Sequence, residues 1–413
     1  MIPLVGQILQ CPDSVDLSGL WRVRRERGEG RWLERGSGVN SPRLALIDWD
    51  AQDVDSQFVR VGRELKHLED DDVIAFSADL KRVSVLWRNK SSANTILLTE
   101  RCDNYCVMCS QPPKDADDSY LLSQAKELVA TLKAVKAEFP IIGITGGEPT
   151  LYGQGFVDLL SQIARDLPEF EVHVLSNGRR FADTAFCDSM KHVITDRLVI
   201  GIPIYGSIAE DHDEVVGAKG AFFETVIGIH NLVEMGALVE IRVVLQRALV
   251  GRLGGIADFV SRNLPGTIQV ALMGLELMGF ARSNFEKVWV DPLDYASELV
   301  AATRHLAANG CNPRIYNHQL CVLAPEIRQY AVSSISDWKR EFDVVCSECA
   351  VTNECGGFFT SSTRGISTGI TPLSSMTDRG SVPVDLLSRT TTKLSEPSRP
   401  SRRLTVTSMP HSS

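Results

Sequence analysis

The sequence has 413 residues, of which 44% are hydrophobic and 23% are charged, and its formal net charge is −9. A chain of this length and composition is globular and large enough for two or three domains. Its acidic balance argues against a general nucleic-acid binder, because contacts with phosphates require clustered Lys and Arg side chains.

The N-terminal residues do not read as a leader peptide, because no basic region precedes an apolar stretch. An apolar run of about 18 residues, the length that spans a membrane, is also absent. We therefore expect a cytoplasmic protein that does not bind membranes. In that reducing compartment, the ten cysteines favour metal or redox chemistry over a disulfide framework.

Residues 1–90 are predicted to form a small β-rich domain. Short runs of alternating polarity, such as Phe58–Val61 and Val83–Trp87, are separated by Gly, Asp and Asn, which is typical of strands joined by turns. At the other end of the chain, residues 366–413 are rich in Ser, Thr and Pro and poor in large apolar side chains. This composition predicts a disordered tail.

Between residues 91 and 310, apolar strand-like segments alternate with segments of helical periodicity. The predicted strands are Thr95–Leu98, Ile141–Thr145, Val172–Leu175, Leu198–Ile204, Val239–Leu245 and Ile268–Leu272. The predicted helices between them include Leu121–Phe139, Phe156–Leu167, Phe222–Gly236, Gly254–Asn263 and Tyr295–Ala308. Six β-then-α units imply an α/β fold with parallel strands, either an open doubly wound sheet or a partial (β/α)6 barrel. Both arrangements put the active site at the C-terminal ends of the strands.

A group of three cysteines directly follows the first predicted strand. Cys102, Cys106 and Cys109 form the pattern C-x3-C-x2-C, and three thiolates on one short loop favour zinc or an iron–sulfur cluster. Structural zinc sites are closed by four protein ligands, whereas a cubane cluster with three protein ligands keeps one iron free for a substrate or cofactor. A zinc site completed by a distant ligand is the alternative.

Glycine-rich and polar motifs follow other predicted strands. The second strand ends in Gly146-Gly147-Glu148-Pro149, where the glycines let a ligand approach the backbone and the proline suits the first turn of a helix. The glutamate puts a carboxylate beside free backbone N–H groups at the predicted active-site edge. Further polar side chains at or after strand ends are Ser176, Asn177 and Gln246.

A second group of cysteines lies near the C-terminus. Cys346, Cys349 and Cys355 form the pattern C-x2-C-x5-C, and Cys321 precedes them. Four cysteines would close a site completely, so a four-iron cluster and a structural zinc ion both fit this set. His318 is an alternative to Cys321 as the fourth ligand.

The C-x3-C-x2-C loop and the Gly146–Pro149 motif together resemble the radical SAM superfamily. The resemblance implies a partial barrel in which the three cysteines bind a [4Fe-4S] cluster whose open iron binds S-adenosylmethionine (SAM). The residues that it implies as SAM contacts are Gly146, Gly147, Glu148, Pro149, Ser176, Asn177, Gln246 (ribose or carboxylate) and Met108 (adenine). Pro203 and Tyr205 depart from the Ser-Leu-Asp-Gly string of related peptide-modifying enzymes, so no ribose role is assigned to them.

The C-terminal cysteines resemble the SPASM extension, in its short form called twitch. This likeness implies an auxiliary [4Fe-4S] cluster bound by Cys321, Cys346, Cys349 and Cys355 in a domain at residues 311–365. Additional strings resemble the His-Xaa-Ser system radical SAM maturases, namely Thr99–Cys102, Cys109–Pro113, Asn317–Cys321, Ser334–Trp338 and Cys355–Phe359.

The resemblance to these maturases implies an enzyme that modifies a ribosomally made peptide or small protein with His-Xaa-Ser repeats. One electron from the reduced cluster would break a C–S bond of SAM, and the resulting 5′-deoxyadenosyl radical would take a hydrogen atom from the substrate. Implied partners are an electron donor and a second radical SAM maturase. Two alternatives are a radical SAM enzyme for a small metabolite and a zinc-bound or degenerate scaffold partner of another maturase.

Overall fold

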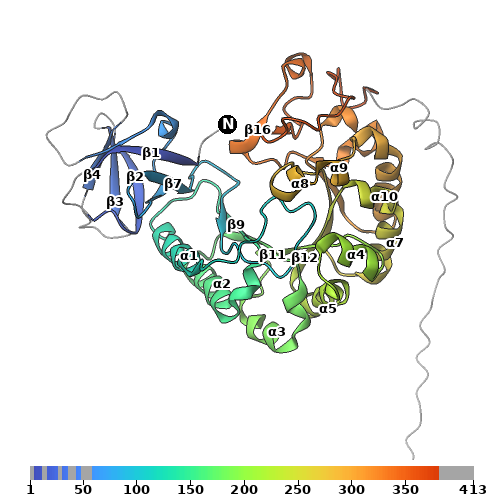
Figure 1. The fold of residues 1–413 in the computed structure, drawn as a ribbon, viewed down its shortest axis with the longest axis horizontal. Helices are drawn as coiled ribbons and strands as arrows, with labels where there is room; N and C mark the ends of the chain where they lie inside the picture. The colour runs from blue at the N-terminus through green and yellow to red at the C-terminus, as the bar shows by residue number, and fades with distance from the viewer. Residues whose placement is uncertain (1–3, 12–15, 27–29, 36–42, 48–57, 381–413) are drawn as a thin grey trace, which may run out of the picture. The chain divides into compact units, whose positions relative to one another are not determined.

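The computed structural model describes residues 4–11, 16–26, 30–35, 43–47 and 58–380. Within these residues, seven N-terminal strands precede a larger α/β domain with an eight-stranded sheet (Figure 1). Residues 381–413, most of the predicted tail, lie outside the described residues. None of the described helices combines the length and the apolar content that crossing a membrane requires.

The N-terminal strands form a closed barrel in the order β1-β5-β4-β3-β2-β6-β7. They are β1 (Val5–Gln10), β2 (Leu20–Glu26), β3 (Gly30–Arg35), β4 (Arg43–Ile47), β5 (Phe58–Val61), β6 (Val73–Phe76) and β7 (Arg82–Trp87). Neighbours are antiparallel except β4 and β5. Trp21, Val23 and Leu33 are completely buried in its core, because alternate residues of a strand face the same side.

Eight parallel strands form the central sheet in the order β15-β14-β13-β12-β11-β10-β9-β8. They are β8 (Thr95–Leu97), β9 (Ile141–Thr145), β10 (Glu171–Leu175), β11 (Leu198–Pro203), β12 (Leu238–Val244), β13 (Gln269–Met273), β14 (Pro313–Tyr316) and β15 (Ala331–Val332). The last two lie in the segment predicted as the C-terminal extension, so a domain boundary at residue 310 would divide the sheet and is wrong. β15 has only two residues, too few for periodicity to reveal.

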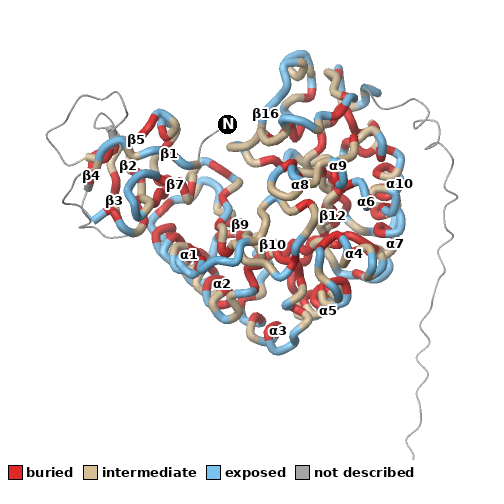
Figure 2. Tube along the Cα trace, in the orientation of Figure 1, coloured by how far each residue is buried: buried red, intermediate tan, exposed pale blue. Residues whose placement is uncertain are grey.

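Helices cover one face of this sheet (Figure 1). The main ones are α1 (Ser119–Leu132), α2 (Gln154–Asp166), α5 (Ala221–Glu234), α7 (Leu253–Asn263) and α10 (Ala296–Ala308). On β12, Val239, Ile241 and Val243 are completely buried, whereas the alternate residues Glu240 and Arg242 are charged. This alternation separates the helix-packed face of the sheet from its inner face. The buried parts of the trace lie mainly where the helices meet the sheet (Figure 2).

Shorter elements connect the strands and follow the sheet. They are η1 (Arg63–Leu65), η2 (Pro149–Tyr152), η3 (Arg179–Ala182), α3 (Thr184–Met190), η4 (Lys191–Val193), α4 (Ala209–Val216), α6 (Arg247–Val250), α8 (Gly279–Ser283), α9 (Phe285–Val288), η5 (Pro292–Tyr295), η6 (Leu320–Val322), η7 (Pro325–Tyr330), η8 (Asp337–Lys339) and η9 (Val344–Glu348). The strands β16 (Arg340–Glu341) and β17 (Phe358–Phe359) form a separate antiparallel pair.

The helix predicted at Leu121–Phe139 ends earlier, at Leu132. The carbonyl oxygen of Ala134 accepts a hydrogen bond from Nη1 of Arg22 in β2 at 2.5 Å. The segment just after α1 thus contacts the N-terminal barrel. Periodicity within the helix carries no information about such a contact.

Residues 366–380 pack against the α/β domain and do not belong to a disordered tail. The Ser367 hydroxyl donates to the carboxylate of Asp291 at 2.5 Å, and the backbone N–H of Thr368 donates to the same carboxylate at 2.9 Å. Leu373 is 1% exposed. The predicted tail boundary at residue 366 is therefore wrong, because the Ser and Thr side chains that suggested disorder satisfy a buried carboxylate here.

Candidate active site

The loop between β8 and α1 carries Cys102, Cys106 and Cys109. Distant parts of the chain hold it in place. The backbone N–H of Tyr105 donates to the carbonyl of Val216 in α4 at 2.7 Å, and the N–H of Phe280 in α8 donates to the carbonyl of Cys109 at 2.8 Å. The loop is thus fixed from both sides by elements that follow β11 and β13.

The three thiols lie close enough to influence one another. Burial raises the pKa of Cys102 to about 12, and the nearby charges of Glu148, Asp103 and Cys109 act in the same direction. Burial and then the Cys109 and Cys102 thiols raise the pKa of Cys106 to about 12, and burial also raises the pKa of Cys109. Metal ligation requires thiolates, so binding of a metal centre here must displace protons.

Asp118 anchors the start of this loop. Its carboxylate is 3% exposed and accepts hydrogen bonds from the Thr99 hydroxyl at 2.6 Å, the Glu100 N–H at 2.7 Å and the Tyr152 hydroxyl at 2.9 Å. Although burial opposes ionisation, these bonds and the charge of Arg101 lower the pKa of Asp118 to about 2. Sequence reasoning missed this residue, because an Asp just before a helix reads as its N-cap.

The two glycines of the Gly146–Pro149 motif are explained by close packing against the cysteine loop. A Cβ atom on Gly146 would lie 2.5 Å from the carbonyl oxygen of Thr99, and one on Gly147 would lie 2.1 Å from the carbonyl oxygen of Arg101. The N–H of Gly147 donates to Thr99 at 2.8 Å. Only glycine allows the end of β9 to approach the loop this closely.

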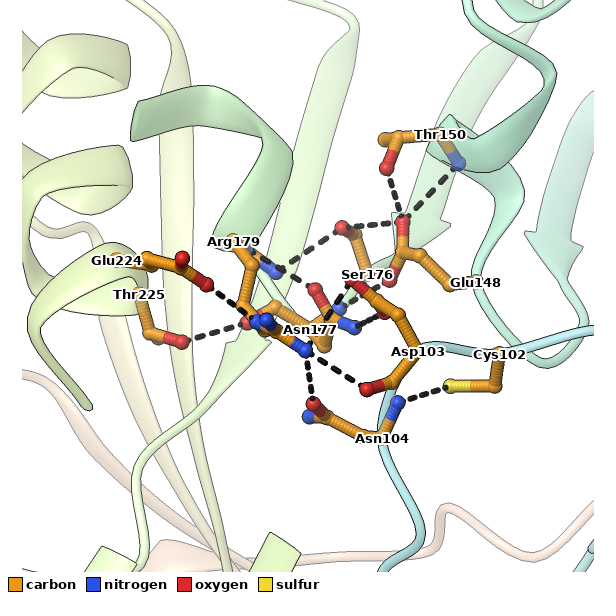
Figure 3. A network of polar contacts seen from close by, with 11 residues as sticks. Cys102, Asp103, Asn104, Glu148, Thr150, Ser176, Asn177, Arg179, Glu224 and Thr225 are labelled. Carbon is orange, nitrogen blue, oxygen red and sulfur yellow. Dashed lines mark hydrogen bonds and ion pairs between the residues drawn. The ribbon is translucent and has the colours of Figure 1, made fainter. Parts of the chain in front are cut away.

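The carboxylate of Glu148 joins the ends of β9 and β10 (Figure 3). It is 1% exposed and accepts hydrogen bonds from the Thr150 N–H (3.0 Å) and hydroxyl (2.6 Å), the Ser176 hydroxyl (2.9 Å) and the Asn177 N–H (2.6 Å). Burial raises its pKa against the effect of these bonds. The network brings three predicted site residues together, with this carboxylate bound to protein donors.

Asp103 and Arg179 tie the cysteine loop to the end of β10 (Figure 3). The Asn177 side-chain amide donates to Asp103 at 2.6 Å. Nη1 of Arg179 donates to the Asp103 carbonyl at 2.7 Å and to Asn104 at 3.0 Å, while Nε donates to Glu224 of α5 at 2.6 Å. Sequence reasoning missed both residues, since nothing in the local pattern distinguishes them from surface charges.

Gln246 and Met108, predicted separately, lie side by side. The Gln246 amide nitrogen is 3.9 Å from the Met108 sulfur, and the two residues are 0% and 5% exposed. The Gln246 side-chain oxygen is buried and has no hydrogen-bond partner among the described residues. An unpaired buried acceptor costs about 1–3 kcal/mol, so this oxygen fits a donor group of a bound cofactor.

Tyr205 lies beside the cysteine loop at the end of β11. Burial raises its pKa, and the thiols of Cys106 and Cys109 act in the same direction. Its backbone N–H donates to Nδ1 of His212 in α4 at 3.2 Å. The departure from the Ser-Leu-Asp-Gly string therefore puts a buried phenol near two of the thiols.

The second group of cysteines also gathers in one place. Burial and then the thiols of Cys355 and Cys346 raise the pKa of Cys321, and burial together with Cys355 and Cys349 raises that of Cys346. The backbone N–H of Leu373 donates to Sγ of Cys349 at 3.4 Å. Four thiols from η6, η9 and the following loop thus share one environment.

His318 is not available as the fourth ligand of this group. Its Nδ1 lies 2.9 Å from the carbonyl of Tyr316 and its Nε2 lies 2.8 Å from the Tyr295 hydroxyl. Because a carbonyl only accepts, Nδ1 carries the proton and Nε2 accepts from the tyrosine. Burial lowers the pKa of His318 to about 4, which keeps the imidazole neutral.

The donor sets of both groups fit iron–sulfur clusters. Within the described part of the chain, no three His, Cys, Asp or Glu side chains surround a single metal ion. A cubane cluster instead attaches each thiolate to a different iron, so its ligands need not converge on one point. Three half-buried thiols at the strand ends match a cluster with an open iron, and four thiols match a fully ligated one.

Comparisons with known proteins cover about half of the chain. Residues 96–247 match the family model described as "Radical SAM superfamily". Fe-coproporphyrin III synthase of Methanosarcina barkeri (strain Fusaro / DSM 804) is 29% identical over 218 residues, which are 50% of this chain and 48% of that protein. A probable GTP 3',8-cyclase of Saccharolobus islandicus (strain Y.N.15.51 / Yellowstone #2) is 26% identical over 196 residues, 46% of this chain and 59% of that protein. The chain thus spans about half the length of the curated relatives that it matches.

Similar solved structures include two proteins with low sequence identity. Streptococcus suis SuiB bound to S-adenosylmethionine has a TM-score of 0.42 at 14% identity, over 54% of this chain and 46% of that chain. A radical SAM methyltransferase from Sphaerobacter thermophilus has a TM-score of 0.40 at 13% identity, over 73% and 78% of the two chains. The segment that matches the family model, residues 96–247, contains the three-cysteine loop, the Gly146–Pro149 motif and Gln246. Over residues 96–247, this chain is thus similar to the radical SAM superfamily.

Proposed function

We propose that this protein is a radical SAM maturase that modifies a ribosomally made peptide or small protein. The [4Fe-4S] cluster would be held by Cys102, Cys106 and Cys109, with SAM beside it. The observation that carries the proposal is the packing of the three-thiol loop against Gly147 and Glu148 at the C-terminal ends of β8, β9 and β10. The match of residues 96–247 to the superfamily model supports it.

When bound, the reduced cluster and SAM supply one-electron cleavage of a C–S bond, giving methionine and a 5′-deoxyadenosyl radical that takes a hydrogen atom from the substrate. The residues of the chain would bind and orient the cluster and SAM and would exclude water from them. Asp118 and Arg179 hold the cysteine loop, and Glu148 aligns the two strand ends beside it. The unpaired oxygen of Gln246 would be available to accept a hydrogen bond from a donor group of SAM, and it belongs to the same side chain that contacts the sulfur of Met108.

We also propose an auxiliary [4Fe-4S] cluster on Cys321, Cys346, Cys349 and Cys355. The support for it is the set of four thiols in one environment, with His318 engaged elsewhere. Complete ligation by protein favours a role in electron transfer or in structure over direct binding of substrate.

The proposed substrate is a small protein with His-Xaa-Ser repeats, and the proposed partners are an electron donor and a second radical SAM maturase. The strings that resemble the His-Xaa-Ser system maturases support this choice. Several of them lie on the two cysteine sites themselves, at Cys109–Pro113, Asn317–Cys321 and Cys355–Phe359.

A second candidate is a radical SAM enzyme that acts on a small metabolite. The names of the relatives favour it, since one is a coproporphyrin III synthase and another a GTP cyclase. A mass change on a His-Xaa-Ser protein encoded beside this gene would exclude this candidate as the main activity. SAM turnover that requires a metabolite and does not change when the peptide is added would support this candidate.

The first test is anaerobic reconstitution with iron and sulfide, followed by dithionite and SAM, with 5′-deoxyadenosine as the product measured. We expect the product from the wild-type chain, together with about eight irons per chain for two four-iron clusters. If the protein is colourless, binds zinc and yields no 5′-deoxyadenosine, the enzyme proposal is wrong and the scaffold alternative takes its place.

A further inference from the structure

Arg328 is a buried cation that forms no direct ion pair with a carboxylate among the described residues, although the charge of Asp378 acts on it from a longer distance. The residue is 1% exposed, and within the described part of the chain its guanidinium bonds only to backbone carbonyls. Nε donates to Leu320 at 2.9 Å and to Leu323 at 3.0 Å. Nη1 donates to Met376 at 2.9 Å and also to the carbonyl of Asp378.

One nitrogen of this guanidinium is left over. Nη2 of Arg328 is buried and has no hydrogen-bond partner among the described residues. Carbonyl groups offer only partial charges, so four of them do not replace a counter-ion. A buried charge without compensation is strongly unfavourable, which indicates that negative charge is supplied from a group next to it.

The four-cysteine site is next to Arg328. Leu320, which accepts from Nε, directly precedes Cys321 in η6. On the other side, Nη1 donates to the carbonyl of Met376, three residues after Leu373. The backbone N–H of Leu373 in turn donates to Sγ of Cys349. Burial lowers the pKa of Arg328, while the charges of Asp378, Cys321 and Cys349 oppose that effect. The guanidinium therefore lies between the two chain segments that flank these thiols.

We propose, on the basis that the auxiliary cluster proposed above is bound, that Arg328 is its buried counter-charge and raises its reduction potential. A [4Fe-4S] cluster with four thiolates is a dianion that becomes a trianion when it accepts one electron. A fixed cation in a buried environment of low dielectric stabilises the more negative form. The charge of Arg328 thus stabilises the reduced form of the cluster. Arg328 does not contact the substrate and acts only through the cluster.

A matched pair of variants separates charge from hydrogen bonding. Arg328→Lys keeps the charge and loses the planar fork, whereas Arg328→Gln keeps an amide donor and loses the charge. The full chain is reconstituted anaerobically and titrated with dithionite, and the reduction of each cluster is followed by EPR. The three-cysteine cluster in the same sample is the internal reference. Arg262→Gln is the control, because it removes an exposed cation of α7 that pairs with Asp258 of the same helix.

We expect Arg328→Gln to lower the reduction equilibrium constant of the auxiliary cluster at least about tenfold, which is about 59 mV for one electron. Arg328→Lys and Arg262→Gln should stay near the wild-type value. Loss of the auxiliary cluster from the Gln variant but not from the Lys variant would also support the counter-charge role.

Two results would overturn the inference. Equal shifts, or equal loss of the cluster, in the Lys and Gln variants would show that the carbonyl bonds matter and the charge does not. An unchanged potential in the Gln variant would show that no electrostatic effect reaches the cluster. Failure of the underlying proposal looks different, because the wild-type chain itself would then bind only about four irons.

Discussion

A Cβ atom placed on Gly147 would lie 2.9 Å from the Cβ atom of Cys102 and 2.1 Å from the carbonyl oxygen of Arg101. The backbone of β9 thus touches the loop that presents the first thiol. Because the obstructing atom is backbone, a side chain at residue 147 cannot be accommodated without moving the loop.

Gly147→Ala should therefore reduce cluster binding and destabilise the apoprotein by about 1–3 kcal/mol, the usual effect of overpacking. Iron content after reconstitution and urea unfolding measure the two effects. Gly254→Ala is the matched control, because a Cβ atom there meets nothing within 4 Å. Full cluster binding by Gly147→Ala would contradict the close packing described for the motif.

Cys106→Ala should abolish formation of 5′-deoxyadenosine and lower the iron content by about half, to one four-iron cluster. The reason is that two thiolates cannot hold a cubane cluster with one open iron. Cys311→Ala serves as the control, since this half-buried thiol belongs to neither group. Unchanged SAM cleavage by Cys106→Ala would refute the assignment of the first site.

Gln246→Met should weaken SAM binding at least about tenfold while making the apoprotein more stable. The substitution keeps the length of the side chain and removes a buried oxygen that has no partner, which is worth about 1–3 kcal/mol to the unliganded fold. Calorimetric titration with SAM and thermal unfolding without it measure both effects. Unchanged SAM affinity would show that the oxygen does not face the cofactor.

Asp118 should make stability depend on pH in acid. Its pKa is about 2 in the folded chain and about 3.9 in an unfolded one, so the folded state binds fewer protons between these values. The stabilisation, about 2 kcal/mol, is complete above the unfolded pKa and disappears as pH falls through the folded pKa.

Urea unfolding of wild type and Asp118→Asn at several pH values tests this. The difference in unfolding free energy between the two proteins should be constant above pH 5 and fall by about half near pH 3. A difference that stays the same at pH 7 and pH 3 would mean that the carboxylate charge does not contribute.

Two truncations should behave differently. A chain that ends at residue 380 should keep both clusters and SAM cleavage. A chain that ends at residue 365 loses the donors to Asp291 and the buried side chain of Leu373, so it should lose the auxiliary cluster. Iron content and melting temperature report the outcome, and equal behaviour of the two chains would show that residues 366–380 are dispensable.

Local patterns were sufficient for the elements on which the site is built. Apolar runs predicted β9 at its observed bounds and β10 within one residue, and the spacing of Cys102, Cys106 and Cys109 indicated their common role. These signals lie within a few neighbouring residues, and hydrophobic periodicity and ligand spacing are visible on that scale.

Contacts between distant segments could not be predicted in this way. Asp118 precedes α1 as an N-cap would, yet its side chain makes no bond to that helix and supports the cysteine loop. Arg328 reads as a surface charge in a polar stretch, and only the fold buries it. The segment after α1 is likewise bonded to Arg22, a residue of the barrel. Each of these cases requires the tertiary arrangement as input.

The hydrogen bonds that close the two cysteine sites fall at very different points along the chain. The loop of the first site receives its last described backbone donor from Phe280, whereas the second needs Leu373 and the carbonyl of Asp378. Synthesis proceeds from the N-terminus and domains fold as they emerge. The proposed site for SAM can therefore be assembled on the ribosome well before the second cysteine site has its last partners, which would order the delivery of the two proposed clusters in time.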